Sequence, residues 1–192
     1  MSEIYDRAQL HRRDYNVAPQ IMPNGKQGLT AFSGVFQENV DLPFLNCVNI
    51  DSAGYAVQDG FNQYYNHYHC AHIPAYSHKD NEMHTIFFGG IAQYYDENGV
   101  LVKDDNVPFV NTIARVTRQS DGSMAEFKLP VTMPGLLGAG SEFIPLDNIP
   151  VYNNGVIKLD DLGPDTTLVG YIYGGISSSA ANIFFTNTGT ES

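Results

Sequence analysis

The chain has 192 residues, which is enough for one domain with a hydrophobic core. It contains 18 glycines, 12 tyrosines and 11 phenylalanines, and only 16% of its residues are charged, which is typical of turn-rich all-β proteins. The net charge of −11 opposes binding to nucleic acid or to an anionic membrane surface.

The two cysteines, Cys47 and Cys70, are too few for a disulfide framework. Both lie in apolar, strand-like runs, so we expect them to be buried free thiols. The chain shows no signal peptide and no apolar run long enough to cross a bilayer, so we expect it to be soluble as written.

The first part of the chain alternates in the way that predicts β-strands. A strong tight-turn signal, Asn24-Gly25, follows the first of these strands. The expected strands cover residues 14–21, 28–36, 43–51 and 54–61.

The same cycle then restarts. The expected strands cover residues 68–76, 84–95, 108–118 and 124–130. Residues 96–99 predict a hairpin tip, and Asp121-Gly122 predicts another turn.

A third, shorter unit follows a glycine-rich stretch that is unsuited to a helix. Its expected strands cover residues 141–145, 168–176 and 182–186, with no fourth strand. A loop at 152–155 and the apolar residues 156–159 separate the first two of these strands. Helical periodicity is almost absent from the whole chain.

Each unit contains an apolar strand that ends on glycine. Aligning the three strands on the last glycine superimposes Gly34, Gly90 and Gly175. We expect a positive φ or a close backbone approach at these positions, because glycine alone tolerates both.

Charged residues within the strands and turns carry weaker signals. Arg115 and Arg118 are three residues apart, so they should point to opposite faces of a strand, one of them buried with an acidic partner. The acidic residues at 96–99 and 104–105 lack the ordered ligand spacing of a calcium loop, so we expect a solvated hairpin tip there.

Three units of about four strands, each with glycine ending its second strand, resemble the blades of a β-propeller. The pairs Gly89-Gly90 and Gly174-Gly175 match the hallmark of the kelch type, and Ser33-Gly34 matches half of it. The chain lacks the downstream tryptophan of kelch blades. From residue 68 to residue 185 it resembles kelch-like propellers of exported Bacteroidetes proteins, which often carry a C-terminal secretion-sorting domain. The resembling stretches are 88–91, 108–113, 134–138 and 170–176.

This resemblance implies an all-β fold of kelch-like propeller blades, each a four-stranded antiparallel sheet. The chain would form a single partial propeller over 1–192, with blades at 11–66, 67–132 and 141–192, the last incomplete. It also implies that the parent protein is exported or sits at the cell surface. A propeller closes with four to eight blades. We therefore expect either a homodimer or the remainder of a longer chain to complete the ring.

The densest polar cluster is the histidine- and tyrosine-rich segment 64–84. If His67 and His69 lie on a strand, they share a face and are weak candidates for zinc or copper ligands. Histidines that only form hydrogen bonds in a tyrosine-rich face are commoner, so we expect no metal and no cofactor.

The function expected from these features is binding of a glycan or protein ligand at the cell surface or outside the cell. Candidate ligand-binding residues come from the first strand of each unit, because first strands converge at the axis of a propeller. They are Arg13, Tyr15, His67, His69 and Glu142. The alternatives are a metal-dependent oxidase or glycan-processing enzyme that uses residues 64–84, and a purely structural adhesion domain. No Ser–His–Asp or paired-carboxylate signature supports catalysis, so no catalytic residue is assigned.

Overall fold

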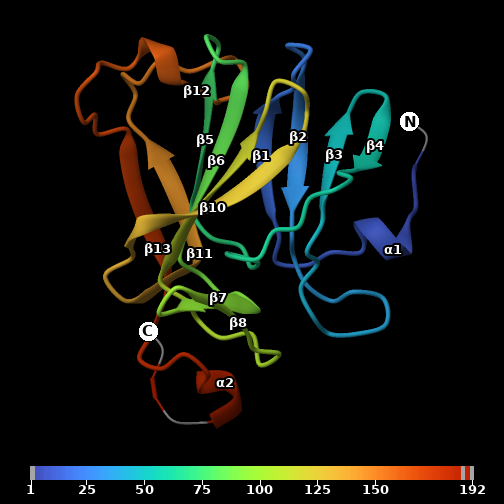
Figure 1. Cartoon of the computed structure of the whole chain (residues 1–192), viewed down its shortest axis with the longest axis vertical. Coiled ribbons are helices and arrows are strands. Elements are labelled where there is room, and N and C mark those ends of the chain that lie inside the picture. Colours follow the sequence, from blue (N-terminus) through green and yellow to red (C-terminus); the bar gives the residue numbers. More distant parts are fainter. Residues whose placement is uncertain (1–2, 187–188, 191–192) are drawn as a thin grey trace.

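In a computed structural model of the chain, residues 3–186 and 189–190 are described, and their architecture is all-β (Figure 1). Strands account for 47% of the chain and helices for 5%, which confirms the expected fold class. The strands form antiparallel sheets, apart from one short parallel pairing.

The first sheet has four antiparallel strands in the order β1-β2-β3-β4. Asn24-Gly25 makes the predicted turn between β1 and β2, with Gly25 at a φ of +78°. A short helix, α1, precedes the sheet, and Asp6 caps its N-terminus. The bounds are α1 Arg7–Leu10, β1 Asn16–Ile21, β2 Gln27–Phe32, β3 Cys47–Asp51 and β4 Gly54–Val57.

The second sheet has the order β10-β9-β6-β5-β12. Its first four strands along the chain pair as β5-β6-β9-β10, and β7 and β8 form a separate hairpin between β6 and β9. The bounds are β5 His72–Ser77, β6 Glu82–Phe88, β7 Tyr94–Glu97, β8 Val100–Lys103, β9 Thr112–Arg118 and β10 Met124–Thr132.

The third sheet has two strands, β11 Leu136–Pro145 and β13 Gly170–Ser178. The chain between them returns to the second sheet, where β12 Ile157–Lys158 pairs in parallel with β5. The short 3-10 helix η1 Leu159–Asp161 follows β12, and α2 Ile183–Thr186 lies near the C-terminus. In the part of the chain that the structure describes, no helix has the length and apolarity needed to cross a membrane.

Two strand predictions were wrong. The expected strand at 84–95 ends at Phe88, because the chain turns at Gly89 and Gly90, both at positive φ. The expected strand at 182–186 is instead the start of a turn followed by α2. In α2 the ring of Phe184 packs against that of Phe109, with ring centroids 5.3 Å apart.

The first two sheets stack face to face around an apolar core. Phe32 on β2 and Phe87 on β6 meet edge to face, with ring centroids 5.1 Å apart. Both cysteines are buried free thiols in this core, as expected. Ala75 on β5 and Phe143 on β11 belong to one apolar cluster. This cluster joins the second sheet to the third.

A buried arginine also crosses the interface between the first two sheets. Arg118 donates to Asn49 Oδ1 at 2.7 Å, to Thr30 Oγ1 at 3.2 Å and to Gln58 Oε1 at 2.7 Å. Amide and hydroxyl oxygens therefore replace the acidic partner that we expected. Arg115 lies on the opposite face of β9, where its guanidinium stacks 5.0 Å from the centre of the Phe127 ring.

Gly34 and Gly90 follow the ends of β2 and β6 and connect these strands to the next part of the chain, whereas Gly175 lies within β13. Gly34, Gly90 and Gly175 have φ angles of +86°, +89° and +90°, which confirms the expected conformation. The Gly34 amide donates to the His67 carbonyl at 3.0 Å, and the Gly90 amide donates to the Leu137 carbonyl at 2.9 Å. A Cβ on Gly34 would lie 2.6 Å from Tyr15 Cβ, which excludes a side chain there, and a Cβ on Gly90 would lie 3.3 Å from Cys70 Cβ.

We predict that Gly89→Ala destabilises the protein by about 3 kcal/mol or more, since its Cβ would overlap the Leu137 carbonyl oxygen. Gly99→Ala is the matched control: Gly99 has φ +85°, but a Cβ there meets nothing within 4 Å. We expect the control to lose only about 1 kcal/mol through backbone strain. Chemical denaturation of the two variants measures the difference, and equal losses would contradict the packing role of Gly89.

Candidate functional site

The first segments of the three units lie side by side in the structure. Asn16 on β1 bonds Tyr68 and Cys70, and Cys70 forms a β-bridge with Ala139 on β11. The chain between β4 and β5 has no regular strand, although Cys70 bridges to a neighbour. The expectation that His67 and His69 share a strand face was therefore wrong.

His67 is fully buried and serves as a structural residue. Its Nδ1 accepts from the Gln93 amide at 3.0 Å, so its Nε2 carries the proton and donates to the Gln63 carbonyl at 2.8 Å. Burial lowers the pKa of His67 to about 4. Both ring nitrogens are used, so this side chain is not placed to bind a ligand.

His69 lies at the junction of all three units. Its backbone amide donates to the Asp14 carbonyl at 2.7 Å, and its carbonyl accepts from the Gly140 amide at 2.8 Å. Its Nε2 is 2.9 Å from Glu142 Oε1 on β11. The two side chains are 36% and 65% exposed, so this pair is accessible to a ligand.

The remaining two predicted residues precede β1, next to Asp14. Arg13 is exposed, and its guanidinium lies 5.6 Å from the centre of the Phe36 ring. Tyr15 is 38% exposed. Because the Asp14 carbonyl accepts from the His69 amide, Arg13 and Tyr15 are connected to the His69–Glu142 pair through the backbone of Asp14. We call Arg13, Tyr15, His69 and Glu142 the junction site.

His72, at the start of β5, is a member of the polar cluster that was not selected as a binding residue. Its Nδ1 lies 3.2 Å from the Cys70 carbonyl oxygen, and its ring packs 6.0 Å from that of Phe87. Burial lowers its pKa, and the Glu142 carboxylate partly opposes this effect. The alternation of residues 72–77 was the signal that could have placed His72 against the first sheet.

The described residues contain no group of three or more histidine, cysteine and acidic side chains arranged to hold a metal ion. Cys70 is fully buried, and burial raises the pKa of its thiol to about 12. It therefore stays protonated at neutral pH, whereas metal binding requires the thiolate.

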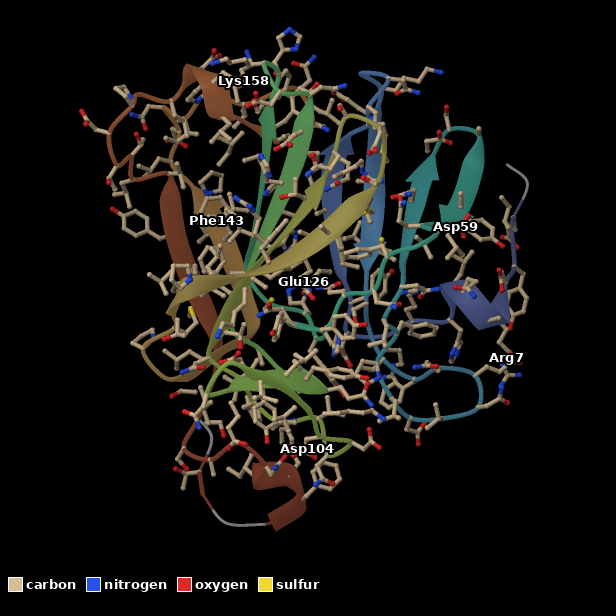
Figure 2. The ribbon with its side chains drawn as sticks, viewed as in Figure 1. Arg7, Asp59, Asp104, Glu126, Phe143 and Lys158 are labelled. Carbon is tan, nitrogen blue, oxygen red and sulfur yellow. The ribbon has the colours of Figure 1, made fainter. Side chains whose placement is uncertain are left out.

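Glu126 on β10 is a half-buried acidic group that the sequence analysis missed; Figure 2 shows it near the middle of the molecule. Its carboxylate accepts from the Tyr64 amide at 2.6 Å and from the Tyr65 amide at 3.1 Å. Burial raises its pKa to about 8, against the effect of these two bonds. Glu126 thus anchors the irregular segment that carries His67 and His69.

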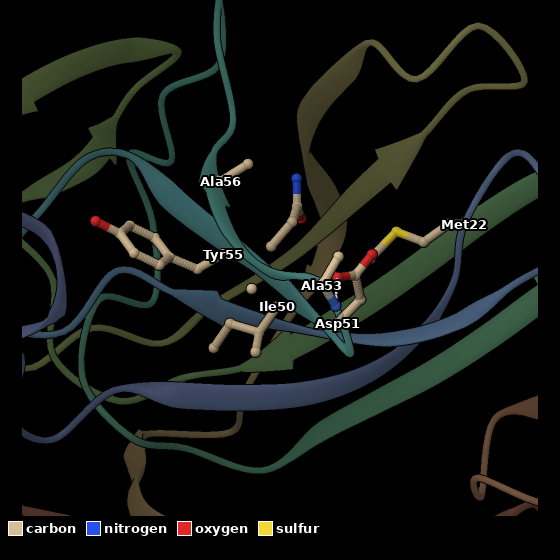
Figure 3. Close-up of a pocket in the computed structure, with 8 residues that line it drawn as sticks. Met22, Ile50, Asp51, Ala53, Tyr55 and Ala56 are labelled. Atoms are coloured by element: carbon tan, nitrogen blue, oxygen red, sulfur yellow. Dashed lines mark hydrogen bonds between the residues drawn. The ribbon is translucent and has the colours of Figure 1, made fainter. Parts of the chain in front are cut away.

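Two surface hollows lie away from the junction site. One, of about 310 Å³, surrounds the β3–β4 hairpin (Figure 3). There Asp51 already accepts from the Ala53 amide, and the Tyr55 hydroxyl donates to Asp6. The other, of about 270 Å³, lies beside β7, and its carboxylates bond Lys128 and Asn182. The carboxylates that line the two hollows therefore already have partners.

Comparisons with known proteins find no matching family model, no matching curated protein and no matching solved structure.

We predict that His67→Ala lowers the free energy of unfolding by about 2 kcal/mol or more, because it leaves two buried backbone groups unpaired. His69→Ala removes only a partly exposed side-chain contact with Glu142 and should cost less than about 1 kcal/mol. Thermal or urea unfolding compares the two variants. A similar cost for both would show that His67 is not the structural residue of the pair.

Glu126 should make stability fall as pH rises. Its carboxyl binds a proton in the folded state up to about pH 8, but in the unfolded chain only up to its ordinary pKa of 4.5. Folding therefore takes up a proton between these values, and the free energy of unfolding decreases by at most about 1.4 kcal/mol per pH unit.

Urea unfolding from pH 5 to pH 9 measures this slope, which Glu126→Gln should flatten. Glu97→Gln, at the exposed end of β7, is the matched control and should keep the slope. An identical slope in wild type and Glu126→Gln would contradict the assignment.

Proposed function

We propose that this chain is an extracellular or cell-surface binding module, built from propeller-like sheets, whose ligand is a carbohydrate bound at the junction site. The propeller-like interpretation is supported by the strand order. The first sheet runs β1-β2-β3-β4, and the second repeats this meander as β5-β6-β9-β10. The first strands of the three sheets, β1, β5 and β11, lie side by side (Figure 1).

The observation that carries the proposed function is the accessible pair of His69 and Glu142. Arg13 and Tyr15 flank Asp14, whose carbonyl accepts from the His69 amide. An imidazole and a carboxylate together donate to and accept from hydroxyl groups. An exposed tyrosine ring offers an apolar face on which a sugar ring can stack, with a hydroxyl at its edge. A peptide could use the same groups, and it is the second ligand class to test.

An enzymatic role for residues 64–84, as a metal-dependent oxidase or a glycan-processing enzyme, has weaker support. His67 uses both ring nitrogens internally, and the Cys70 thiol is buried. Location outside the cell rests on the sequence resemblance alone, and secretion of the parent protein is the measurement that tests it.

A glycan array probed with the purified chain tests the proposed function. We expect binding to a carbohydrate, weakened about tenfold or more in His69→Ala and in Glu142→Gln, because each removes a polar contact to the ligand. His78→Ala, in the exposed turn after β5, is the matched control and should bind as wild type does.

Equal affinity in His69→Ala and His78→Ala would place the ligand elsewhere. The chain could instead bind a peptide library and no carbohydrate, with the same sensitivity to His69→Ala. That result would support the junction site as the binding site and show that its ligand is a peptide.

A further inference from the structure

The third sheet has a long free edge, where β13 lies outside β11 (Figure 1). One side of β13 pairs with β11, and the other side pairs with no strand among the described residues. Five consecutive residues of β13, from residue 171 to residue 175, are exposed. Tyr173, Tyr171 and Ile172 are 73%, 60% and 37% exposed. Such an edge presents unpaired backbone N–H and C=O groups, to which another strand can bind.

The glycine alignment relates this edge to paired strands elsewhere in the chain. Residues 170–173 of β13 take the place of residues 29–32 of β2 and 85–88 of β6. In the first sheet residues 29–32 pair antiparallel with β3, and in the second sheet residues 85–88 pair antiparallel with β9. Residues 170–173 therefore have the position of an inner strand, but the strand that would follow them is not supplied by the described residues.

The direction of the free backbone groups follows from the bonds to β11. The Leu146 amide donates to the Val169 carbonyl at 3.0 Å, and these two residues continue the register of β11 with β13. Hydrogen-bonded and non-hydrogen-bonded pairs alternate along an antiparallel ladder. Tyr171 therefore directs its N–H and C=O groups towards β11, whereas Ile172 directs both of its groups to the free edge.

The other sheet edges carry features that hinder the addition of a strand. β4 has four residues and β12 has two, so both offer a short edge. β10 carries Glu126, Lys128 and Pro130, and β1 carries Pro19. Short strands, charges and prolines are the usual protection of sheet edges. β13 has nine residues, none of them charged and none of them proline, so it lacks this protection.

The chain on either side of β13 leads away from the free edge. After β13, the Ala181 carbonyl accepts from the Phe109 amide at 2.8 Å, and Ile183 packs in an apolar cluster with Ile91. Before β13, the short strand β12 pairs with β5 in the second sheet. Neither flanking segment supplies the missing strand within the described residues, so its source lies outside them.

We propose that the free edge of β13 binds an extended segment of another polypeptide, which pairs antiparallel with residues 170–173. In strand addition of this kind, main-chain hydrogen bonds supply affinity and alternate side chains supply specificity. The chemistry of the partner follows from β9, which occupies this place in the second sheet. β9 combines apolar residues with Arg115 and Arg118. A partner with basic residues also suits a chain whose net charge is −11.

A synthetic peptide of residues 108–118 is the probe, because it contains β9 and has two arginines and no acidic residue. We expect it to bind the purified chain in an NMR titration, whereas a scrambled peptide of the same composition does not. On binding, hydrogen exchange of the Ile172 amide should slow about tenfold or more. The Tyr171 amide, which bonds to β11, should be protected in both states. Absence of binding, or unchanged exchange at Ile172, would overturn the proposal.

A proline substitution tests the backbone bonds directly. Ile172→Pro removes an N–H that faces the free edge and leaves the bonds to β11 in place. It should weaken peptide binding about tenfold or more. Ile172→Val keeps the N–H and is the matched control, which should bind as wild type does. Equal binding by the two variants, both shown by thermal melts to be folded, would overturn the pairing.

The same test can be made on the peptide, without any change in the protein. Ala114 lies opposite Phe87 in the second sheet, and Ile172 takes the place of Phe87 in the glycine alignment. A probe with Ala114→Pro therefore lacks the N–H that would meet Ile172, and its binding should weaken by a similar factor. Unchanged binding of this probe would contradict the proposed register.

Light scattering of the chain without peptide tests a second copy as the occupant of the edge. We expect the edge to be free in the absence of peptide, so Ile172→Pro should leave the measured mass unchanged. A wild-type dimer that Ile172→Pro converts to the 21.2 kDa monomer would assign the edge to a second copy and overturn the proposal. Ile172 lies outside the junction site, so carbohydrate binding by these variants reports on the proposed function separately.

Discussion

The close contact of backbones where each second strand ends is the constraint on which the other features depend. Gly34 and Gly90 take a positive φ there; Gly34 donates to His67 in the segment before β5, and Gly90 donates to Leu137 on β11. This contact places β1, β5 and β11 beside one another, so residues far apart in sequence share a neighbourhood. His69 and Glu142 meet across 73 positions because the backbones of the last two sheets lie this close.

The sheets could be predicted because their signals are local. Alternation and turn dipeptides such as Asn24-Gly25 depend only on neighbouring residues, and the glycine alignment found the second strand of each unit. The chain from residue 58 to residue 71 could not be predicted in this way. Its path is fixed by contacts from elsewhere, among them the Glu126 carboxylate on the Tyr64 and Tyr65 amides.

The same distinction separates the candidate residues. Arg13, Tyr15, His69 and Glu142 were chosen because first strands should converge, and their neighbourhood follows from that topology. His67 was grouped with His69 by spacing, but the Gln63 carbonyl and the Gln93 amide direct its ring inward. The spacing of Arg115 and Arg118 predicted that one of them is buried, but not that its partners are amide and hydroxyl oxygens. The role of Glu126 had no sequence signal, because a charged residue in an alternating strand normally faces solvent.

A binding site at the junction and the exposed face of the third sheet are two consequences of one arrangement. Stacking sheets in a single direction brings first strands together, and it leaves Tyr171 and Tyr173 of the third sheet exposed. Tyr173 on the uncovered face of the third sheet is paired directly with Glu142 across β11 and β13. Any molecule that covers that face therefore lies next to the Glu142 carboxylate.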